Sequence, residues 1–275
     1  MINLMLCGND KVFDGMLITL ISISKHTKEP LNVYLMTMNL TELNPNFTKL
    51  EEKHRKAIED KLRERNKNSK VTIVDETNLY KKEMPVNVNK KTHYTPYIFL
   101  RLLCDKIKEL PEKILYLDCD IVCYKDIKEL YDIDMTDYEV AMALDFIGKK
   151  WIDINYRNSG VVLMNLKNIR KSNCFEKARH LCMTKRMTLP DQTALNKACK
   201  KNLLLPEKYN EQNKKKEDTV LQHFSMKLKY FPFFHPLNIK PWQIDRVHEK
   251  YKIFDYDDVY KEYLKVKEKY EKENK

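Results

Sequence analysis

The sequence predicts an α/β protein built on a Rossmann-like sheet that helices flank. Three observations support this class. Short apolar runs typical of buried strands alternate with helical segments along most of the chain, and the chain opens with a strand, a helix and a second strand. The run ILYL, residues 114–117, then leads directly into two carboxylates, Asp118 and Asp120. The end of such a strand is where sheets of this class bind their ligands.

The individual elements follow from local patterns. Residues 2–7 predict a buried strand, residues 15–25 an apolar helix, and residues 31–36 a second strand, which together form a βαβ unit. The remaining elements are expected in this order: a charged helix around 50–62, a strand at 71–74, a polar stretch to about 92, a helix at 97–110, the strand at 114–117, a short helix at 127–131, strands at 140–144 and 160–164, and helices near 168–182 and 192–199.

The domain organisation is expected to be simple. The sequence contains no internal repeat and no Gly/Ser linker, so residues 1–245 are predicted to form one domain. Residues 246–275 form a basic, aromatic tail, in which the Lys, Glu and Tyr residues after Tyr251 predict a surface helix.

Composition narrows the class of protein. The chain is 43% hydrophobic and 33% charged, as expected for a globular protein, and no apolar run approaches the roughly 20 residues of a membrane span. We therefore expect a cytoplasmic protein. The seven cysteines form no CxxC pair and lie mostly in apolar segments, which predicts reduced thiols in the core and indicates neither a disulfide framework nor a zinc site.

The net charge of +11 admits nucleic acid, anionic lipid or a phosphorylated substrate as a partner. The lysines are spread along the chain and mixed with acidic residues, and no nucleic-acid recognition motif is present. A nucleic-acid-binding protein is therefore the least favoured class.

The two aspartates after residues 114–117 predict a metal site. Residues two apart in an extended chain project from the same face, roughly 6–7 Å apart. Asp118 and Asp120 can therefore converge on one hard divalent cation or on a metal-bound phosphate. The alternative is a strand end followed by an acidic turn.

Four further motifs fall in loops after predicted strands. They are CGND at residues 7–10, NSG at 158–160, PDQTALN at 190–196, and a segment that runs from His223 to KPW at 240–242. Each alone is also explained by a turn, a helix cap or a helix stop. Their order along the chain is the informative feature.

In that order the motifs resemble the family 8 glycosyltransferases, retaining enzymes that use sugar nucleotides and include bacterial lipopolysaccharide galactosyl- and glucosyltransferases and glycogenin. The resemblance covers nearly the whole chain and implies a GT-A type fold, a mixed sheet flanked by helices. YLDCDIVC is similar to the family's YLDxDxxV, RNSGVVLMNL to FNSGVxLxNL, and DQTALN to DQxxLN.

The resemblance implies a role for each matched residue. CGNDKVF, with Cys7, Asn9, Lys11 and Val12, corresponds to the loop that holds uridine. Arg101 corresponds to a donor-contacting arginine, Asp145 to a sugar-contacting acid, and Gln192 lies beside the anomeric carbon. The other implied donor-binding residues are Asp118, Cys119, Asp120, Asn158, Ser159, Gly160, Asp191 and Lys240.

The chain departs from the family pattern at three places. Val12 stands where many members carry a uracil-stacking Tyr, and Asn9 stands where many carry an Asp. Extra residues also separate His223 from Lys240, so that His223 and His235 are both candidates for the metal-binding histidine. His223 is preferred because TVLQHF keeps the family's strand and its aromatic residue.

These residues imply a metal-dependent retaining transferase that moves a hexose, glucose or galactose, from a UDP-sugar to a cell-envelope glycan or lipid-linked acceptor. Asp118, Asp120 and His223 would bind Mn²⁺, with Mg²⁺ as a weaker substitute, and Lys240 would contact the diphosphate. Asp191 would hydrogen-bond the hexose. Gln192 is a poor nucleophile, which favours acceptor attack on the face that the leaving group vacates. The alternative is a sugar-nucleotide-binding protein without transferase activity.

The tail adds an expectation about location. Its lysines predict peripheral contact with an anionic membrane on the inner face of the cell membrane, although several glutamates offset their charge.

Overall fold

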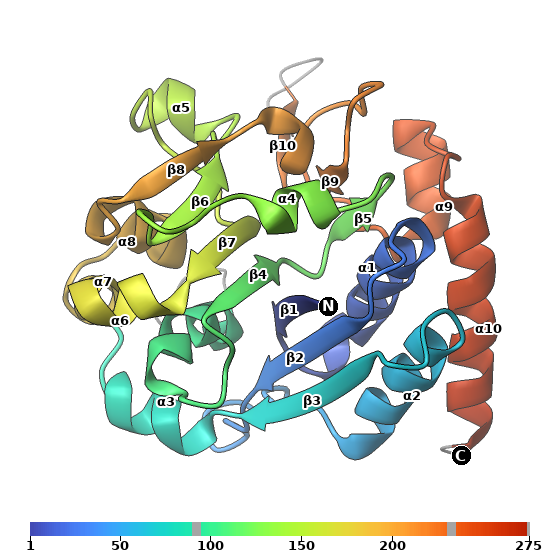
Figure 1. The fold of residues 1–275 in the computed structure, drawn as a ribbon, viewed down its shortest axis with the longest axis horizontal. Coiled ribbons are helices and arrows are strands. Elements are labelled where there is room, and N and C mark those ends of the chain that lie inside the picture. The colour runs from blue at the N-terminus through green and yellow to red at the C-terminus, as the bar shows by residue number, and fades with distance from the viewer. Residues whose placement is uncertain (90–94, 230–234, 274–275) are drawn as a thin grey trace.

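A seven-stranded sheet forms the centre of the computed structural model, which describes residues 1–89, 95–229 and 235–273 (Figure 1). The strand order is β3-β2-β1-β4-β7-β6-β8. The strands are β1 (Ile2–Cys7), β2 (Leu31–Thr37), β3 (Lys70–Asp75), β4 (Lys113–Leu117), β6 (Val140–Ala143), β7 (Val161–Asn165) and β8 (Asn202–Leu205).

The sheet is mixed, as predicted. Strand β1 pairs in parallel with β2 and with β4, and β3 pairs in parallel with β2. Strand β7 is antiparallel to both β4 and β6, and β8 extends the sheet in parallel to β6. The carboxyl ends of β1 and β4 therefore meet at one edge, which places the segments after Cys7 and Leu117 side by side.

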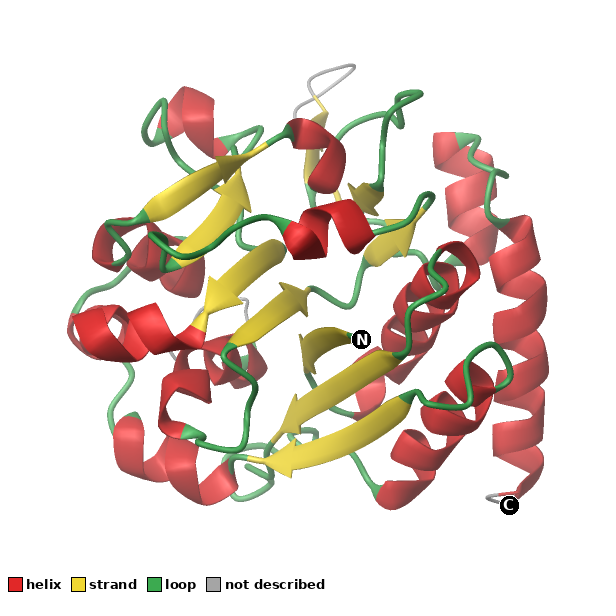
Figure 2. Cartoon of the chain, in the orientation of Figure 1, coloured by secondary structure: helices red, strands yellow, loops and turns green. Residues whose placement is uncertain are grey.

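Helices cover both faces of the sheet (Figure 2). The larger ones are α1 (Phe13–His26), α2 (Glu52–Arg63), α6 (Leu166–Ser172), α7 (Cys174–Thr184), α8 (Pro190–Ala198), α10 (Asp257–Glu273) and the 3₁₀ helix η2 (Pro96–Lys106). Alternate residues of β4 divide between two cores. Leu115 and Leu117 pack with α1, whereas Ile114 and Tyr116 pack with η2 and α7. Because successive residues of a strand point to opposite faces of the sheet, a run of consecutive apolar residues predicts a strand that is buried on both faces.

Two small antiparallel pairs lie outside the main sheet. Strand β5 (Ile121–Cys123) pairs with β9 (Leu221–His223), and β10 (Lys227–Lys229) pairs with β11 (His235–Leu237). The first pair is important for the site, because it joins the segment after the two aspartates to a strand about a hundred residues later in the chain.

Several sequence predictions need correction. The polar stretch before residue 92 contains a helix, α3 (Thr77–Glu83), and neither the short helix α5 (Gly148–Trp151) nor strand β8 was predicted. The short helix expected at 127–131 is present as α4 (Lys128–Asp132). The helix expected at 168–182 is divided at Asn173, which adopts a left-handed conformation with φ of 55°. Asparagine tolerates this conformation better than most residues. Helix η2 ends at Lys106, earlier than residue 110.

The C-terminal segment is a helix, but one of its faces is part of the core. After α9 (Ile244–Arg246) and the π-helical turn η4 (Val247–Tyr251), α10 packs against α1 and α2. Its residues Val259, Tyr260 and Tyr263 are buried, as is Tyr256 just before it. Within the described residues, no helix combines the length and apolar character that a membrane span requires.

Candidate active site

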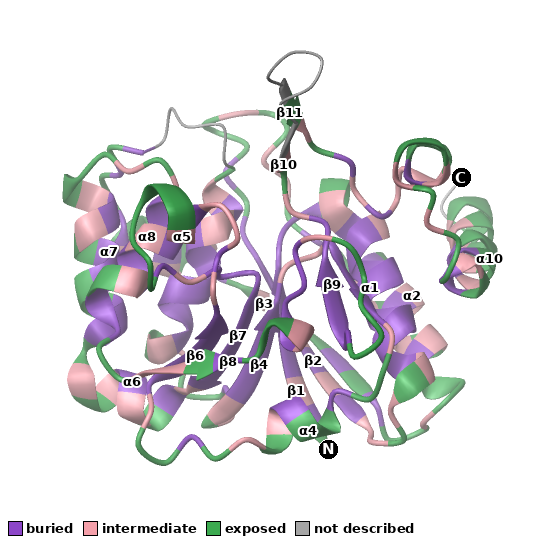
Figure 3. Cartoon of the chain, turned by 90° about the horizontal axis from the view of Figure 1, so that it is seen from above, coloured by how far each residue is buried: buried purple, intermediate pink, exposed green. Residues whose placement is uncertain are grey.

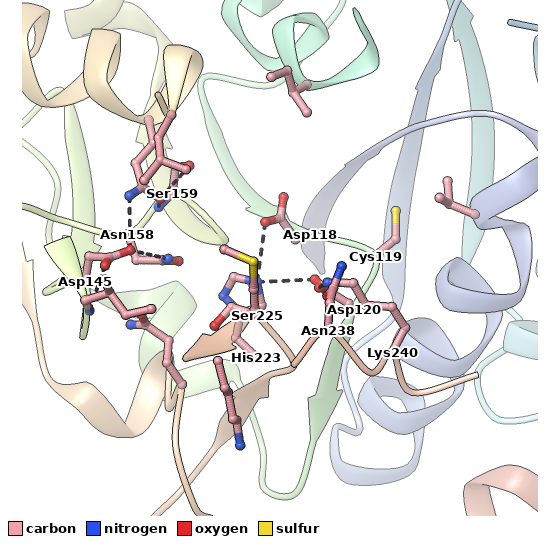
Figure 4. Close-up of a pocket in the computed structure, with 18 of the residues that line it drawn as sticks. Asp118, Cys119, Asp120, Asp145, Asn158, Ser159, His223, Ser225, Asn238 and Lys240 are labelled. Atoms are coloured by element: carbon pink, nitrogen blue, oxygen red, sulfur yellow. Dashed lines mark hydrogen bonds and ion pairs between the residues drawn. The ribbon is translucent and has the colours of Figure 1, made fainter. Parts of the chain in front are cut away.

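A cleft of about 1830 Å³ opens where the carboxyl ends of β1 and β4 meet. Among the site residues proposed from the sequence whose side chains the structure describes, all but Gly160 line it. The structure thus brings together side chains from the first loop, from η2, from the segments after β4 and β6, from α8 and from β9 (Figure 4). The backbone of His235 begins β11, but its side chain lies outside the described part of the structure.

Asp118, Asp120 and His223 form the centre of the cleft. Pairing of β5 with β9 places His223 opposite Ile121, and the amide of Phe224 donates to the carbonyl oxygen of Asp120 at 2.9 Å. His223 Nε2 lies 3.3 Å from Asp120 Oδ1 and 3.6 Å from Asp118 Oδ2. One ligand atom from each of the three residues lies within 4.8 Å of the others. Two carboxylates and an imidazole are a ligand set that suits Mn²⁺.

The other ring nitrogen of His223 is held by Asn210. His223 Nδ1 lies 3.2 Å from Asn210 Oδ1, and Asn210 Nδ2 donates to Asn158 Oδ1 at 2.9 Å. Asn210 is completely buried. With Nδ1 protonated and donating to Asn210, Nε2 is directed at the two aspartates and is available as a ligand.

The ionisable groups in this cluster shift one another's pKa values. Burial opposes the charged imidazole, but Asp120 and Asp118 together raise the pKa of His223 above its ordinary value. Burial likewise disfavours the Asp120 carboxylate, but Lys240, with Nζ 2.5 Å from Asp120 Oδ2, and His223 hold the pKa of Asp120 far below its ordinary value. Asp120 therefore stays ionised, and the side chains of Lys240 and His223 both point toward it (Figure 4).

Gly160 is required by the position of His223. A Cβ at Gly160 would lie 2.3 Å from Cε1 of His223 and 2.5 Å from Nδ1. The carbonyl oxygen of Gly160 also accepts a hydrogen bond from the amide of Asp118 at 2.8 Å. Gly160 does not line the cleft. Because it has no side chain, however, it leaves the space that the ring of His223 occupies.

Arg101 connects the cluster of Asp118, Asp120 and His223 to the other side of the cleft. Its guanidinium donates to Asp118 Oδ1 at 2.9 Å and to the carbonyl oxygen of Ser159 at 2.6 Å, and Nε lies 3.5 Å from Asp191 Oδ2. It also stacks 3.9 Å above the ring of Tyr116. Burial opposes its charge, but Tyr116, Asp118 and Asp191 raise the pKa of Arg101, so it remains a cation.

Asp145, Asn158 and Gln192 form a hydrogen-bonded network. Asp145 Oδ2 accepts from Asn158 Nδ2 at 2.8 Å and from Gln192 Nε2 at 3.0 Å, while Oδ1 accepts from the amides of Ile147 and Gly148. Gln192 Oε1 in turn accepts from the amide of Ser159 at 3.0 Å. Asp145 thus fixes the orientation of two neighbouring amides, a function that the sequence did not indicate.

Asp191 lies in the first turn of α8, between Arg101 and the network. Burial raises the pKa of Asp191, and Arg101 and two backbone amides oppose that effect. The carboxylate is therefore in a desolvated position beside a fixed cation, where a polar ligand would replace the missing water.

The first loop supplies the opposite wall. Asn9 is buried and donates from Nδ2 to the carbonyl oxygen of Asn46 at 3.1 Å, which ties the CGND loop to residues 44–47. Phe47 and Tyr97 also line this wall, in edge-to-face contact. Neither aromatic residue was proposed from the sequence, because they follow no motif and reach the cleft only through the tertiary fold.

Asn210 and Gln212 were also missed. Gln212 accepts from the amide of Phe146 and donates to the carbonyl oxygen of Leu144, so it closes the loop after β6 over the cleft. The only signal available in the sequence was the polar run YNEQN before TVLQH.

A second cluster lies in the core. Glu139, Cys174 and Cys199 have ligand atoms within 4.8 Å of one another, and all three are buried. All seven cysteines are free thiols, and six of them are buried. The structure thus places two cysteines together that lie far apart in the sequence, which their spacing did not indicate.

The fold is that of the GT-A glycosyltransferases. The galactosyltransferase LgtC, solved with donor and acceptor sugar analogues, superposes with a TM-score of 0.65 over 96% of each chain at 16% identity. GlyE, a glycosyltransferase from Streptococcus pneumoniae, gives a TM-score of 0.60 over 96% of this chain and 64% of its own, also at 16% identity. The model of glycosyl transferase family 8 matches residues 3–246, and the chain belongs to that family.

Curated relatives are similar over shorter stretches. Glycosyltransferase GlyA of Streptococcus pneumoniae is 37% identical over 29% of this chain and 11% of its own length. The lipopolysaccharide 1,3-galactosyltransferase of Salmonella typhimurium is 26% identical over 56% of this chain and 50% of its own. The lipopolysaccharide 1,2-glucosyltransferase of Escherichia coli K12 is 27% identical over 56% and 57%. The chain thus spans between about a tenth and slightly more than half of the length of these relatives.

Proposed function

We propose that the protein is a metal-dependent retaining hexosyltransferase that uses UDP-glucose or UDP-galactose and extends a cell-envelope glycan or lipid-linked acceptor. The observation that carries this proposal is the convergence of Asp118, Asp120 and His223 at the centre of the cleft. Family membership and the similarity to lipopolysaccharide transferases support it.

The three residues fit a divalent cation. Nδ1 of His223 is hydrogen-bonded to Asn210, so Nε2 faces the two carboxylates. Arg101 and Lys240 lie beside the cluster as ion-pair partners of the two aspartates and would not bind the metal themselves. Mn²⁺ accepts this mixture of oxygen and nitrogen ligands, with Mg²⁺ as the weaker substitute. A bound cation would stabilise the negative charge that develops on the departing diphosphate.

The surrounding residues are suited to hold the donor. Lys240 would weaken its ion pair with Asp120 and contact the diphosphate. Its flexible side chain allows this movement. Arg101 and Asp191 would hydrogen-bond the hexose, and Asn9 and Val12 would border the base. Because Val12 cannot stack on uracil as an aromatic residue would, we expect Phe47 or Tyr97 on the same wall to supply apolar contact with the base.

Gln192 is held too firmly to act as a nucleophile. Its oxygen accepts from Ser159 and its nitrogen donates to Asp145. An immobilised, neutral amide can hold an acceptor hydroxyl or the sugar ring, but it does not attack carbon readily. We therefore propose same-face attack by the acceptor, with Asp145 acting as a positioning residue through Gln192.

A panel of nucleotide sugars tests the proposal. We expect Mn²⁺-dependent release of UDP from UDP-glucose or UDP-galactose, with smaller rates from GDP- and ADP-sugars and loss of release in EDTA. Binding of UDP-sugar without any turnover, with or without candidate glycans, would instead favour a sugar-nucleotide-binding protein.

Peripheral membrane contact through the tail remains a prediction. Helix α10 uses one face to pack on α1 and α2, and Lys267 bonds to Asp14. The exposed lysines Lys261, Lys265 and Lys269 on the remaining surface would make the contact. Truncating the tail would expose its buried tyrosines, so charge-neutralising substitutions are the cleaner test.

A further inference from the structure

The mouth of the cleft is apolar and basic, unlike its interior. Eleven large apolar side chains are conspicuously exposed among the described residues, and five of them border this mouth. Trp151, Ile152 and Met226 line it, Phe254 lies between the lining residues Ile253 and Asp255, and Ile154 is two residues beyond the lining residue Ile152. We call these five residues, with the lysines described below, the rim.

One side of the rim is the α5 segment, which is largely exposed (Figure 3). Trp151 is 72% exposed, Ile152 53% and Ile154 77%. Three large apolar side chains within four residues at such exposure are costly in water, and a patch of this kind usually marks a binding surface. Lys149 and Lys150 accompany them, with Nζ 5.6 and 4.5 Å from the ring centre of Phe146.

The other side of the rim comes from segments far along the chain. It contains Met226 and the segment from η4 to α10, where Phe254 is 54% exposed. Its lysines line the same cleft as Trp151. They are Lys214, Lys215, Lys227, Lys250 and Lys252. The acidic residue that lines this outer part is Asp255, which pairs with Lys215 at 2.6 Å.

The charge of the cleft therefore changes with depth. The other lining carboxylates, Asp118, Asp120, Asp145 and Asp191, lie in the interior, where Arg101 and Lys240 oppose them. The rim has a clear excess of lysine over acid. Exposed tryptophan and isoleucine interspersed with lysine are the composition of surfaces that sit at the boundary between lipid headgroups and acyl chains.

We propose that the rim binds the surface of an anionic bilayer, so that the cleft opens toward the membrane. Trp151, Ile152, Ile154 and Phe254 would enter the headgroup region, and the lysines would contact lipid phosphates. The membrane contact itself does not depend on the proposed function. Only its consequence does, namely that the acceptor would reach the proposed metal site from the plane of the membrane. It moves the main membrane contact from the outer face of α10 to the mouth of the cleft.

Vesicle binding by the full chain tests the proposal without any donor or acceptor. We expect co-sedimentation with phosphatidylcholine vesicles that contain about one third phosphatidylglycerol, and much less with phosphatidylcholine alone. Binding should weaken as salt is raised, since screening reduces lysine–phosphate attraction. Lys149→Gln with Lys150→Gln should weaken it about fivefold per lysine, and Trp151→Ala with Ile154→Ala at least tenfold.

Matched controls separate the rim from general surface properties. Leu204→Ala with Val86→Ala removes two other exposed apolar side chains, which do not line the cleft, and Lys67→Gln with Lys70→Gln removes two exposed charges outside it. Both pairs should bind vesicles as the parent does. The chain has only two tryptophans, and Trp242 is partly buried, so a blue shift of emission on vesicle addition should disappear in Trp151→Phe.

Three results would overturn the proposal. The first is absence of binding to anionic vesicles. The second is binding that survives the rim substitutions but is lost in Lys261→Gln/Lys265→Gln/Lys269→Gln, which would assign the contact to α10. The third is unchanged vesicle binding of the Trp151 and Ile154 variant together with a raised KM for a water-soluble acceptor, which would make the rim an acceptor subsite. UDP release by the parent without vesicles reports separately on the proposed function.

Discussion

At the scale of single residues, the site depends on charges that compensate one another. Asp118 bonds to Arg101, and Asp120 bonds to Lys240 and faces His223. The pKa of Asp120 is lowered because Lys240 and His223 face it, and this carboxylate becomes available for a metal as soon as Lys240 shifts toward a bound diphosphate.

Asp118→Asn or Asp120→Asn should therefore abolish transfer while preserving the fold. Each change keeps the size of the side chain but weakens a metal ligand, and we expect a loss of about 10²-fold or more in the rate of UDP release. Asp132→Asn, which changes an exposed acid that pairs only with Lys128 among the contacts of the described residues, is the matched control. Full activity of either site variant at saturating Mn²⁺ would refute the metal assignment.

Asn210 gives a second prediction at this scale. Asn210→Leu is close in size but removes the acceptor for His223 Nδ1, so the imidazole loses its fixed orientation. Mn²⁺ affinity, measured by calorimetry, should fall about 10–100-fold, less than for His223→Ala. If the affinity is unchanged at an unchanged Tm, Asn210 has no part in orienting the ligand.

The two histidines provide the comparison that the sequence left open. Titrating Mn²⁺ against UDP release should show a large shift of the metal curve for His223→Ala, because an imidazole ligand is lost. His235→Ala should leave the metal curve in place. A large shift for His235→Ala alone would reverse the assignment.

At the scale of elements, α10 is tied to the body of the protein through Glu262. This carboxylate lies 2.9 Å from Lys61, 2.7 Å from Arg65 and 3.4 Å from Lys25, which belong to α2, the turn after it and α1. Burial alone would raise the pKa of Glu262, but these cations hold it below the ordinary value of a glutamate. The pairing therefore stabilises the fold above the ordinary pKa of a glutamate and stops doing so as the pH falls through the lowered value.

Glu262→Gln should accordingly reduce the free energy of unfolding at pH 7 by about 0.5–1 kcal/mol, a modest amount because solvent screens the group. The difference from the parent should shrink as the pH falls below about 4, which urea denaturation at a series of pH values would measure. Glu268→Gln alters the same helix but only its bond to Lys272, and should have a smaller effect. A difference that persists at low pH would contradict the electrostatic explanation.

At the scale of the whole molecule, the cleft joins segments from nearly the full length of the chain. The first loop, η2, α8, β9 and the segment after η4 all line it. A ligand that binds these segments together should therefore stabilise the whole fold. Mn²⁺ with UDP, at about 100 times the dissociation constant, should add about 2.7 kcal/mol to the free energy of unfolding. EDTA or Asp118→Asn should remove most of the accompanying rise in Tm.

The sequence by itself determined six of the seven strands of the central sheet, all but β8, together with the two aspartates and the order of the motifs. These are local features, since a buried strand and the residues that follow it are written in a few consecutive positions, and β1, β2 and β4 lie where the pattern places them. Helix limits were predicted less accurately, as the division at Asn173 shows, because a single residue in the left-handed conformation ends one helix and begins the next without changing the apolar pattern.

Only the tertiary structure decided which distant side chains meet. The pairing of β5 with β9 selects the neighbours of Asp120, and the contact of Asn210 with His223 depends on that register. The burial of one face of α10 and the gathering of Trp151 and Phe254 at one mouth arise in the same way. Such contacts join segments up to 253 residues apart, and no periodicity within a segment encodes the partner against which it packs.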